Sequence, residues 1–305
     1  MLGRRCKFSV ALPIVLALCV GPSITFAAAT PAVASSPSHD VKPFDAADLA
    51  GHGKFIMSLC RDLQNRVWVG TETEGVYCCD PSQEAGSRWK HFTKADGLGD
   101  DTAYALCCDK LGRVWAGTLN HGVSVYNGYA WKTYGLLTGP LGSHVTSLAV
   151  CPTDGDCWMA TEAGLSRYSA ASDRWSYYTR REGLASNSIS AIAFDRAGNL
   201  YVATQCDGLC IGSANGKYRS WRSVSAPPDL ATTATGSGLP SNLVNTLLVT
   251  NDDAIFAGTD GGLARSTDGG ATWIFVRGAD WRNKLEGKDV SVRHLTNFTN
   301  FGRIA

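Results

Sequence analysis

The sequence has almost no excess charge of either sign. It contains 28 lysines and arginines against 27 acidic residues, and charged residues make up only 18% of the 305-residue chain. Proteins that bind nucleic acid through its phosphate backbone carry a pronounced basic face. The balance of charge therefore argues against nucleic acid as a partner.

The sequence also lacks the short motifs that mark common catalytic sites. It has no HExxH, GxSxG or P-loop, and no GxGxxG between a strand and a helix. No cysteine pair has CxxC spacing with histidines nearby, which disfavours a zinc site. Acidic residues are numerous, however, so composition alone does not exclude a glycoside hydrolase, which needs two carboxyl groups.

A long apolar run is missing everywhere except at the N-terminus. Three basic residues precede the run Phe8 to Val20, and small residues follow at positions 27–29. This is the layout of a signal peptide, so residues 1–29 are predicted to be a leader or, as the alternative, an uncleaved membrane anchor. Either outcome predicts an extracytoplasmic protein, secreted or periplasmic.

Nine of the eleven cysteines follow the leader, and export permits disulfides. Two pairs flank short Gly/Asp turns, namely Cys151 with Cys157 and Cys206 with Cys210. Each pair would bridge a hairpin if the strand register brought its Cβ atoms to within about 4.5 Å. The alternative is that these cysteines are unpaired, small apolar side chains.

One sequence motif occurs five times along the chain, as WVGTETEGV, WAGTLNHGV, WMATEAGL, YVATQCDGL and FAGTDGGL. Its threonines are 47, 43, 43 and 55 residues apart, and they are Thr71, Thr118, Thr161, Thr204 and Thr259. This period is typical of a four-stranded propeller blade. The sequence therefore predicts an all-β propeller, with five complete repeats and a partial sixth.

Two residue types recur at fixed places in these units. An aromatic residue is predicted to pack between neighbouring sheets, at Trp68, Trp115, Trp158, Tyr201 and Phe256. A glycine is predicted to close the turn after the second strand, at Gly75, Gly122, Gly164, Gly208 and Gly262. Both recurrences indicate structural roles.

The segment RWSYYTRREGLASNSISAIAFDRAGNLYVAT (174–204) resembles the two-component regulator propeller repeat. Its W..Y, EGL.SNSISAI, D..GNL and VAT elements occur in the order of that family, and looser copies cover about residues 54–276. The resemblance implies the extracytoplasmic sensor part of a membrane signalling protein, often one that responds to oligosaccharides. The kinase and regulator parts of such proteins do not occur in this sequence.

The repeats predict the organisation of the chain beyond the leader. Residues 30–53 are predicted to be a linker that contains a candidate closing strand, Asp40 to Leu49. The blades are predicted at about 54–93, 102–134, 144–179, 188–224 and 243–277, with a partial sixth at 288–305. The last of these rests on Thr299 to Ala305, which resembles Asp109 to Trp115. The alternatives are that five blades close alone, that the linker lends a strand, or that the chain is part of a longer protein.

The stretch STDGGATW in the fifth unit resembles an Asp-box, a motif of sialidases and other sugar-active propellers. Its characteristic residues are Ser266, Asp268, Gly270, Thr272 and Trp273. It falls between the third and fourth strands of its unit, where an aspartate and a glycine suit a tight turn. We therefore interpret it as a structural turn.

Propeller geometry assigns one set of loops to a candidate ligand-binding face. The turns between second and third strands share a face with the connections that lead to the next blade. The candidate residues there are Glu72, Glu74, Asp96, Asp100, Asp101, Asn120, His121, Glu162, Arg180, Arg181, Asp207 and Asp260. The carboxylates could bind sugar hydroxyls or calcium, and the arginines could bind an acidic sugar. The alternative is that they are solvated turn residues.

Together these observations predict a non-catalytic sensor or binding propeller for a carbohydrate or another small extracytoplasmic ligand. The expected partner is a signalling membrane protein. No cofactor is expected, with calcium as the alternative. The alternatives are a secreted propeller glycoside hydrolase or lyase and a scaffold for protein partners. The enzyme alternative lacks the Arg-Ile-Pro motif of sialidases, in whose place the chain has Lys54 to Met57.

Overall fold

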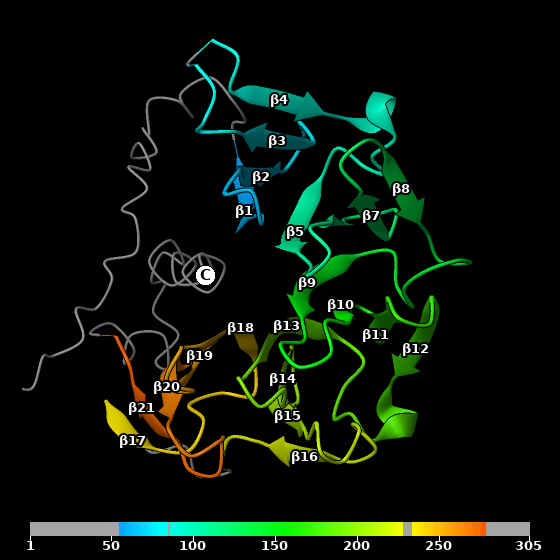
Figure 1. Ribbon diagram of the computed structural model, residues 1–305. Coiled ribbons are helices and arrows are strands. Elements are labelled where there is room, and N and C mark those ends of the chain that lie inside the picture. Colours follow the sequence, from blue (N-terminus) through cyan, green and yellow to red (C-terminus); the bar gives the residue numbers. More distant parts are fainter. Residues whose placement is uncertain (1–54, 85, 228–233, 279–305) are drawn as a thin grey trace, which may run out of the picture. The chain divides into compact units, whose positions relative to one another are not determined.

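The computed structural model describes residues 55–84, 86–227 and 234–278 (Figure 1). All of them belong to one compact unit of the chain, Lys42–Ala305. The predicted leader (1–29), the linker (30–53) and the partial sixth blade (288–305) lie outside the described residues.

The described residues form five antiparallel sheets, each built from consecutive strands. The first sheet contains β1 (Ile56–Arg61), β2 (Val67–Thr71), β3 (Val76–Cys79) and β4 (Trp89–Phe92). The second contains β5 (Ala103–Cys108), β6 (Val114–Thr118), β7 (Val123–Tyr126) and β8 (Trp131–Tyr134). The third contains β9 (Val145–Val150), β10 (Cys157–Thr161), β11 (Gly164–Ser169) and β12 (Arg174–Tyr178). The fourth contains β13 (Ile189–Phe194), β14 (Leu200–Thr204), β15 (Leu209–Gly212) and β16 (Trp221–Val224). The fifth contains β18 (Val244–Val249), β19 (Ile255–Thr259), β20 (Gly262–Ser266), β21 (Ile274–Val276) and β17 (Thr235–Ser237).

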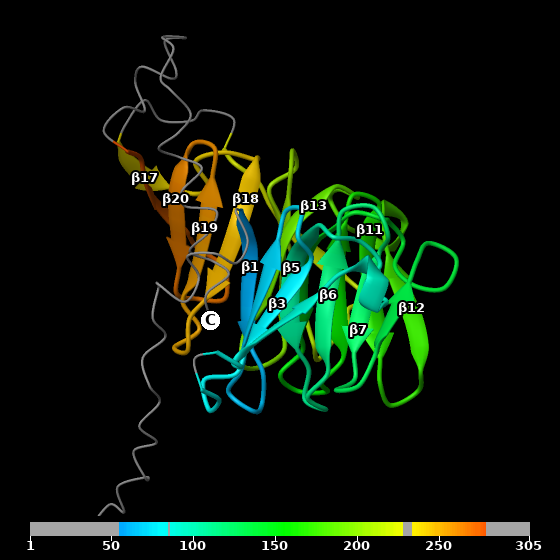
Figure 2. The same cartoon turned by 90° about the horizontal axis from the view of Figure 1, so that it is seen from above.

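The five sheets follow one another around a common axis (Figure 1). One edge strand of each sheet lies innermost, and these strands pack in the succession β1, β5, β9, β13, β18. Seen from above, the strands of neighbouring sheets run side by side along that axis (Figure 2). The all-β class and the four-stranded, blade-like units are thus confirmed, whereas residues 55–278 do not show a closed ring.

Buried aromatic residues join each sheet to the next. Trp68 on β2 lies 5.4 Å from Tyr126 in the second sheet, measured between ring centroids, and Trp158 on β10 lies 4.7 Å from Tyr218 in the fourth. The equivalent Phe256 on β19 is partly exposed, because no described sheet follows the fifth. The recurring aromatic residues therefore form the contacts between sheets, as predicted.

The five recurring threonines and glycines make the same hydrogen bond in every sheet, across three intervening residues in the first, second and fourth sheets and across two in the third and fifth. The Oγ1 of Thr71 donates to the carbonyl oxygen of Gly75 over 2.9 Å, and the other four pairs do the same over 2.8–2.9 Å. Gly75 has a φ of 75°, and a Cβ atom there would lie 2.2 Å from the carbonyl oxygen of Phe92. Only glycine fits this position, which explains why every unit has one.

The fifth sheet has an additional strand that the repeat pattern does not predict. β17 pairs with β21 at the outer edge of the sheet, inside the connection between β16 and β18. Two short 3-10 helices, η2 (Lys94–Asp96) and η3 (Arg180–Glu182), lie between sheets. No helix in the described part of the chain is long and apolar enough to span a membrane.

Candidate functional site

Each innermost strand has a β-bulge near its start. The register shifts once between the innermost strand and its neighbour in every sheet, at the residues Met57, Tyr104, Thr146, Ser190 and Asn245. A bulge bends its strand and redirects a side chain, and bulges are common beside binding sites. Five equivalent bulges therefore lie at one end of the axis, on the face from which the inner strands begin.

These five residues differ in chemistry although their neighbours along the strands are alike. The Oγ1 of Thr146 donates to the carbonyl oxygen of Ile189 over 2.8 Å, and the hydroxyl of Ser190 donates to the carbonyl oxygen of Val244. These two hydroxyls connect neighbouring inner strands. Met57, Tyr104 and Asn245 instead line a cavity on the axis.

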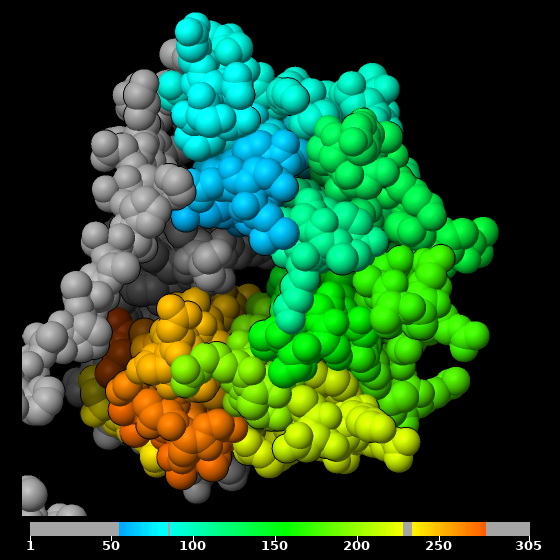
Figure 3. All heavy atoms as spheres, in the orientation of Figure 1, coloured from blue at the N-terminus to red at the C-terminus, as the bar shows by residue number. Residues whose placement is uncertain are grey.

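This axial cavity has a volume of about 660 Å³ and is lined by all five innermost strands. Its polar lining residues include Ser58, Arg61, Ser147, Asn245 and Thr246. Part of the hollow is visible between the inner strands in the space-filling view (Figure 3). A volume of this size is typical of sites for small ligands.

An aromatic and imidazole pair lies at the bulged end of the cavity. The rings of Tyr104 and His144 meet edge to face, with centroids 5.0 Å apart. The carboxylate of Glu162 accepts hydrogen bonds from the main-chain nitrogens of Ser143 and His144, each over 3.1 Å. Glu162, one of the predicted face residues, therefore positions the segment that carries His144.

His144 has an unused hydrogen-bonding atom. Its Nε2 is buried and has no hydrogen-bond partner among the described residues. Burial lowers the pKa of His144, and the nearby Glu162 carboxylate offsets this only in part. The lowered pKa favours the neutral imidazole, and a buried Nε2 without a partner among the described residues is unusual because buried polar atoms are normally satisfied.

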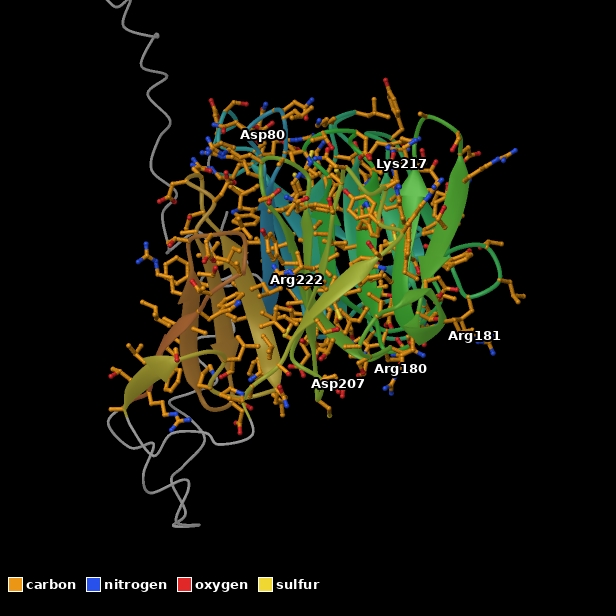
Figure 4. The ribbon with its side chains drawn as sticks, turned by 90° about the horizontal axis from the view of Figure 1, so that it is seen from below. Asp80, Arg180, Arg181, Asp207, Lys217 and Arg222 are labelled. Carbon is orange, nitrogen blue, oxygen red and sulfur yellow. The ribbon has the colours of Figure 1, made fainter. Side chains whose placement is uncertain are left out.

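The predicted sorting of loops onto two faces agrees with the structure. Arg180, Arg181 and Asp207 lie on one face, and Asp80 and Lys217 lie on the opposite face (Figure 4). The first of these faces is the one where the inner strands begin, so the twelve predicted residues surround the bulged end of the axis. None of them lines the cavity itself.

Three of the predicted residues form one cluster. The Oδ2 of Asp100 accepts hydrogen bonds from the main-chain and side-chain nitrogens of Asn120, over 3.2 and 3.0 Å, and lies 3.4 Å from Nδ1 of His121. Burial acts to raise the pKa of Asp100, but hydrogen bonds from Asn120 and His121 outweigh it and lower the pKa. Asp100 is therefore an ionised acceptor that holds the turn between β6 and β7.

Several other candidates hold the chain's own turns. Asp96 accepts hydrogen bonds from the main-chain nitrogen and hydroxyl of Thr93 and completes a capping box at η2. Asp101 accepts a hydrogen bond from the main-chain nitrogen of Lys94 over 2.8 Å. Glu74 accepts a hydrogen bond from the hydroxyl of Tyr77 over 3.2 Å. These contacts fit the interpretation of the acids as turn residues.

The remaining candidates point toward solvent or lie in turns. Arg180 and Arg181 begin η3 and are exposed, as are Glu72 and Asp260, while Asp207 is half-buried. No group of three or more metal-ligating side chains occurs in the part of the chain that the structure describes. Calcium binding therefore stays a prediction from the sequence.

The Asp-box-like turn lies between β20 and β21. The hydroxyl of Ser266 donates to Asp268 over 2.8 Å, and Asp268 accepts hydrogen bonds from the nitrogen and hydroxyl of Thr272. The indole of Trp273 donates to the carbonyl oxygen of Gly270 over 3.0 Å. All five predicted residues of the motif thus serve the turn, which the loop sorting puts on the face opposite the bulges.

Neither predicted cysteine pair is bridged in the described part of the chain. Cys151 packs between the third and fourth sheets, whereas Cys157 packs between the second and third, so the two thiols lie on opposite sides of one sheet. Cys206 is exposed in a turn, and Cys210 is buried with its Sγ accepting a hydrogen bond from the nitrogen of Ala185. The described structure therefore agrees with the alternative in which these cysteines are unpaired.

The family model for the two-component regulator propeller matches residues 97–120 and 183–205. Both matches begin at the glycine after a 3-10 helix, cross an innermost strand and end beyond the second strand. The chain carries two-component regulator propeller repeats. No curated protein matches the sequence.

Solved structures with different roles resemble this regulator-propeller chain. The extracellular domain of the one component system BT4673 from B. thetaiotaomicron is 22% identical with a TM-score of 0.56, over 70% of this chain and 27% of that one. An ancestral GH74 enzyme is 14% identical with a TM-score of 0.54, over 73% and 31%. An auxiliary nutrient binding protein from Bacteroides ovatus is 12% identical with a TM-score of 0.50, over 72% and 56%. The chain spans about a quarter of the BT4673 domain, and identities this low show the fold alone.

Sequence reasoning did not single out the residues that line the cavity mouth. Met57, Tyr104 and Asn245 occupy one column of the aligned repeats, in which the neighbouring columns hold repeated apolar or small residues. Variation confined to that column was the available signal. It was missed because the strand reads as a buried one, and the bulge that turns the column toward the axis leaves no mark in the sequence.

Proposed function

We propose that this chain is a non-catalytic, extracytoplasmic sensor propeller that binds a small ligand at the bulged end of its axial cavity. The observation that carries the proposal is the set of five equivalent bulges on the innermost strands. Three of these bulges present side chains of different chemistry to the cavity. The fold is constant from repeat to repeat, while the side chains at this bulge position differ from blade to blade.

The chemistry of the mouth favours a carbohydrate or another small polar ligand. Tyr104 offers an aromatic ring, His144 offers an unpartnered nitrogen, and Asn245 offers an exposed amide. A sugar presents both an apolar face that stacks on an aromatic ring and hydroxyls that need hydrogen-bond partners. The exposed Arg180 and Arg181 on the same face would add affinity for an acidic sugar.

The setting of this module is also part of the proposal. The leader-like N-terminus supports an extracytoplasmic location, and the BT4673 structure that this fold resembles is described as an extracellular domain. A membrane signalling protein is the proposed partner, because two-component regulator propeller repeats match the chain. For the fold, we propose five blades followed by a partial sixth. The partly exposed Phe256 supports this, because every earlier aromatic residue of its column is covered by a following sheet.

A thermal-shift panel of oligosaccharides, neutral and acidic, tests the proposal on the purified chain. A specific glycan should raise the melting temperature without being turned over. Tyr104→Ala should then weaken affinity about tenfold, the loss expected when one aromatic contact is removed. Tyr129→Ala is the matched control, because Tyr129 is 94% exposed in the turn between β7 and β8 on the opposite face.

Other outcomes identify the alternatives. Turnover of a glycan that is lost in Asp100→Asn or Asp101→Asn would indicate a glycoside hydrolase or lyase. If no oligosaccharide raises the melting temperature and a stable protein partner is recovered instead, the chain is a scaffold. A glycan that binds the Tyr104→Ala variant as tightly as the original chain would place the ligand elsewhere.

A further inference from the structure

Two thiols from different sheets face each other in the contact between the second and third sheets. Cys107 on β5 and Cys157 on β10 are fifty residues apart in sequence, yet their Sγ atoms are only 3.9 Å apart. Cys157 is 2% exposed within a cluster that includes Trp115, Val145 and Tyr168, and Cys107 packs against that cluster. The pair is therefore held together by the packing of two sheets.

The separation is that of two reduced thiols in contact. A disulfide bond is about 2 Å long, so the sulfur atoms must approach each other by roughly 2 Å. Rotations about the two Cα–Cβ bonds move the sulfur atoms by distances of this order. The sequence left hairpin bridges within one sheet and unpaired thiols as alternatives, whereas the structure brings together thiols of neighbouring sheets.

We propose that Cys107 and Cys157 form an inter-sheet disulfide when the chain meets an oxidant that is itself a disulfide, either a small molecule or an oxidised thiol-disulfide protein. Cys107 loses its proton, and its thiolate attacks the external disulfide RSSR, which forms a mixed disulfide and releases RS−; this takes up a proton and becomes RSH. Cys157 then loses its proton and attacks the mixed disulfide at the sulfur of Cys107, which releases a second RSH. The two cysteines together lose two protons and two electrons, and these reduce RSSR to two RSH.

The order of attack follows from access. Cys107 lines the axial cavity, and Cys157 does not. The neighbouring Cys157 thiol and burial both raise the pKa of Cys107, so little thiolate is present in the folded protein. The bridge should therefore form quickly while the chain folds under oxidising conditions and slowly once folding is complete.

The other cysteines provide internal comparisons. Cys151 has the hydroxyls of Thr153 and Tyr218 beside its sulfur, at 3.2 and 3.8 Å. Cys206 is exposed and should stop at the mixed disulfide. Cys60 and Cys108 also line the cavity and provide the competing pairings. This inference does not depend on the identity of the ligand proposed above.

The experiment is to refold the full chain in oxidised and reduced glutathione, block the remaining thiols with iodoacetamide and map it after a non-reducing tryptic digest. Trypsin leaves Cys107 with Cys108 on residues 95–110, and Cys151 with Cys157 on residues 133–167. We expect these two peptides to be linked, at a mass two hydrogens below their sum, and the link to disappear on reduction. Fragmentation of the linked peptides in the original chain assigns the bond without any variant.

Serine variants give a second assignment. Cys107→Ser and Cys157→Ser should each abolish the link, whereas Cys108→Ser and Cys151→Ser should retain it. The bridged form should melt several degrees above the reduced form, because it closes a fifty-residue loop in the unfolded chain. Fragments that assign the bond to Cys108, Cys151 or Cys60, or a fully folded chain that carries only mixed disulfides, would overturn the proposal.

Discussion

Arg222 on the outer strand of the fourth sheet donates a hydrogen bond from Nη1 to the carbonyl oxygen of Gly270 in the fifth sheet, over 2.9 Å. Its Nη2 donates to the adjacent carbonyl oxygen of Gly269 over 3.0 Å. One guanidinium thus holds two successive carbonyls of the Asp-box-like turn. The turn serves as a contact between sheets, which gives it a structural role.

Removal of this guanidinium should loosen the fifth sheet from the fourth. Arg222→Ala should lower the free energy of unfolding by about 1–2 kcal/mol, the usual contribution of charge-assisted hydrogen bonds to carbonyls. Chemical denaturation followed by tryptophan fluorescence measures the change. Arg219→Ala, at an exposed arginine of the preceding turn, should leave the midpoint unchanged, and an equal loss in both variants would contradict the contact.

Asp268 should stabilise the same turn in a pH-dependent way. Hydrogen bonds from the side chain and nitrogen of Thr272, and then from Ser266, lower the pKa of Asp268 from 3.8 to about 2. Because the folded pKa lies below the unfolded value, the stabilisation is complete above about pH 4 and is lost as the pH falls toward 2. Asp268→Ala should show a smaller loss of melting temperature over that range and unchanged ligand affinity. A selective loss of binding would contradict the structural assignment.

A buried aspartate in the second sheet should be far more important for stability than an exposed one. Asp109 is 2% exposed, and its Oδ2 accepts hydrogen bonds from Nε of Arg113 over 2.6 Å and from the indole of Trp115 over 2.8 Å. Asp109→Ala removes the acceptor of the buried Trp115 indole and of the partly exposed Arg113 guanidinium, and should lower the free energy of unfolding by about 3 kcal/mol. Asp154→Ala removes a partly exposed partner of Arg167 and should cost below about 1 kcal/mol. Urea titrations of the two variants compare them directly.

His144 should make stability depend on pH near neutrality. Burial lowers its pKa below the usual 6.5, so the unfolded chain binds a proton more readily than the folded chain does. Stability should therefore be complete above about pH 6.5 and should decrease as the pH falls from there toward the folded pKa. His144→Gln should flatten this part of the curve of melting temperature against pH, with His91→Gln as the control. An unchanged slope would show that the imidazole is not the titrating group.

The repeat made most of the fold predictable, because its recurring residues have local causes. The hydrogen bond from Thr71 to Gly75 forms within five residues, and the recurring threonine and glycine make the same bond in each unit, although the third and fifth units have one residue fewer between them. The packing of Trp68 against the second sheet is equally regular, since every unit meets its neighbour in the same way. Local interactions that recur in every unit can be recognised from the repeated residues in the sequence.

The candidate site was less predictable because it depends on contacts distant in sequence. Tyr104 meets His144 across two sheets, and Cys107 meets Cys157 in the same manner. Neither juxtaposition follows from spacing along the chain. β17 was missed for a related reason, since Thr235–Ser237 becomes a strand only because β21 offers a free edge.

The succession of inner strands from β1 to β18 predicts the order in which the sheets unfold locally. In a linear array of repeats, each unit is stabilised by its contacts with its neighbours. The two end sheets each pack on one described neighbour, whereas the third sheet packs on two. We therefore expect opening to begin at the end sheets and to proceed inward. Amide hydrogens of β2 and β19 should exchange with solvent before those of β10, in the third sheet.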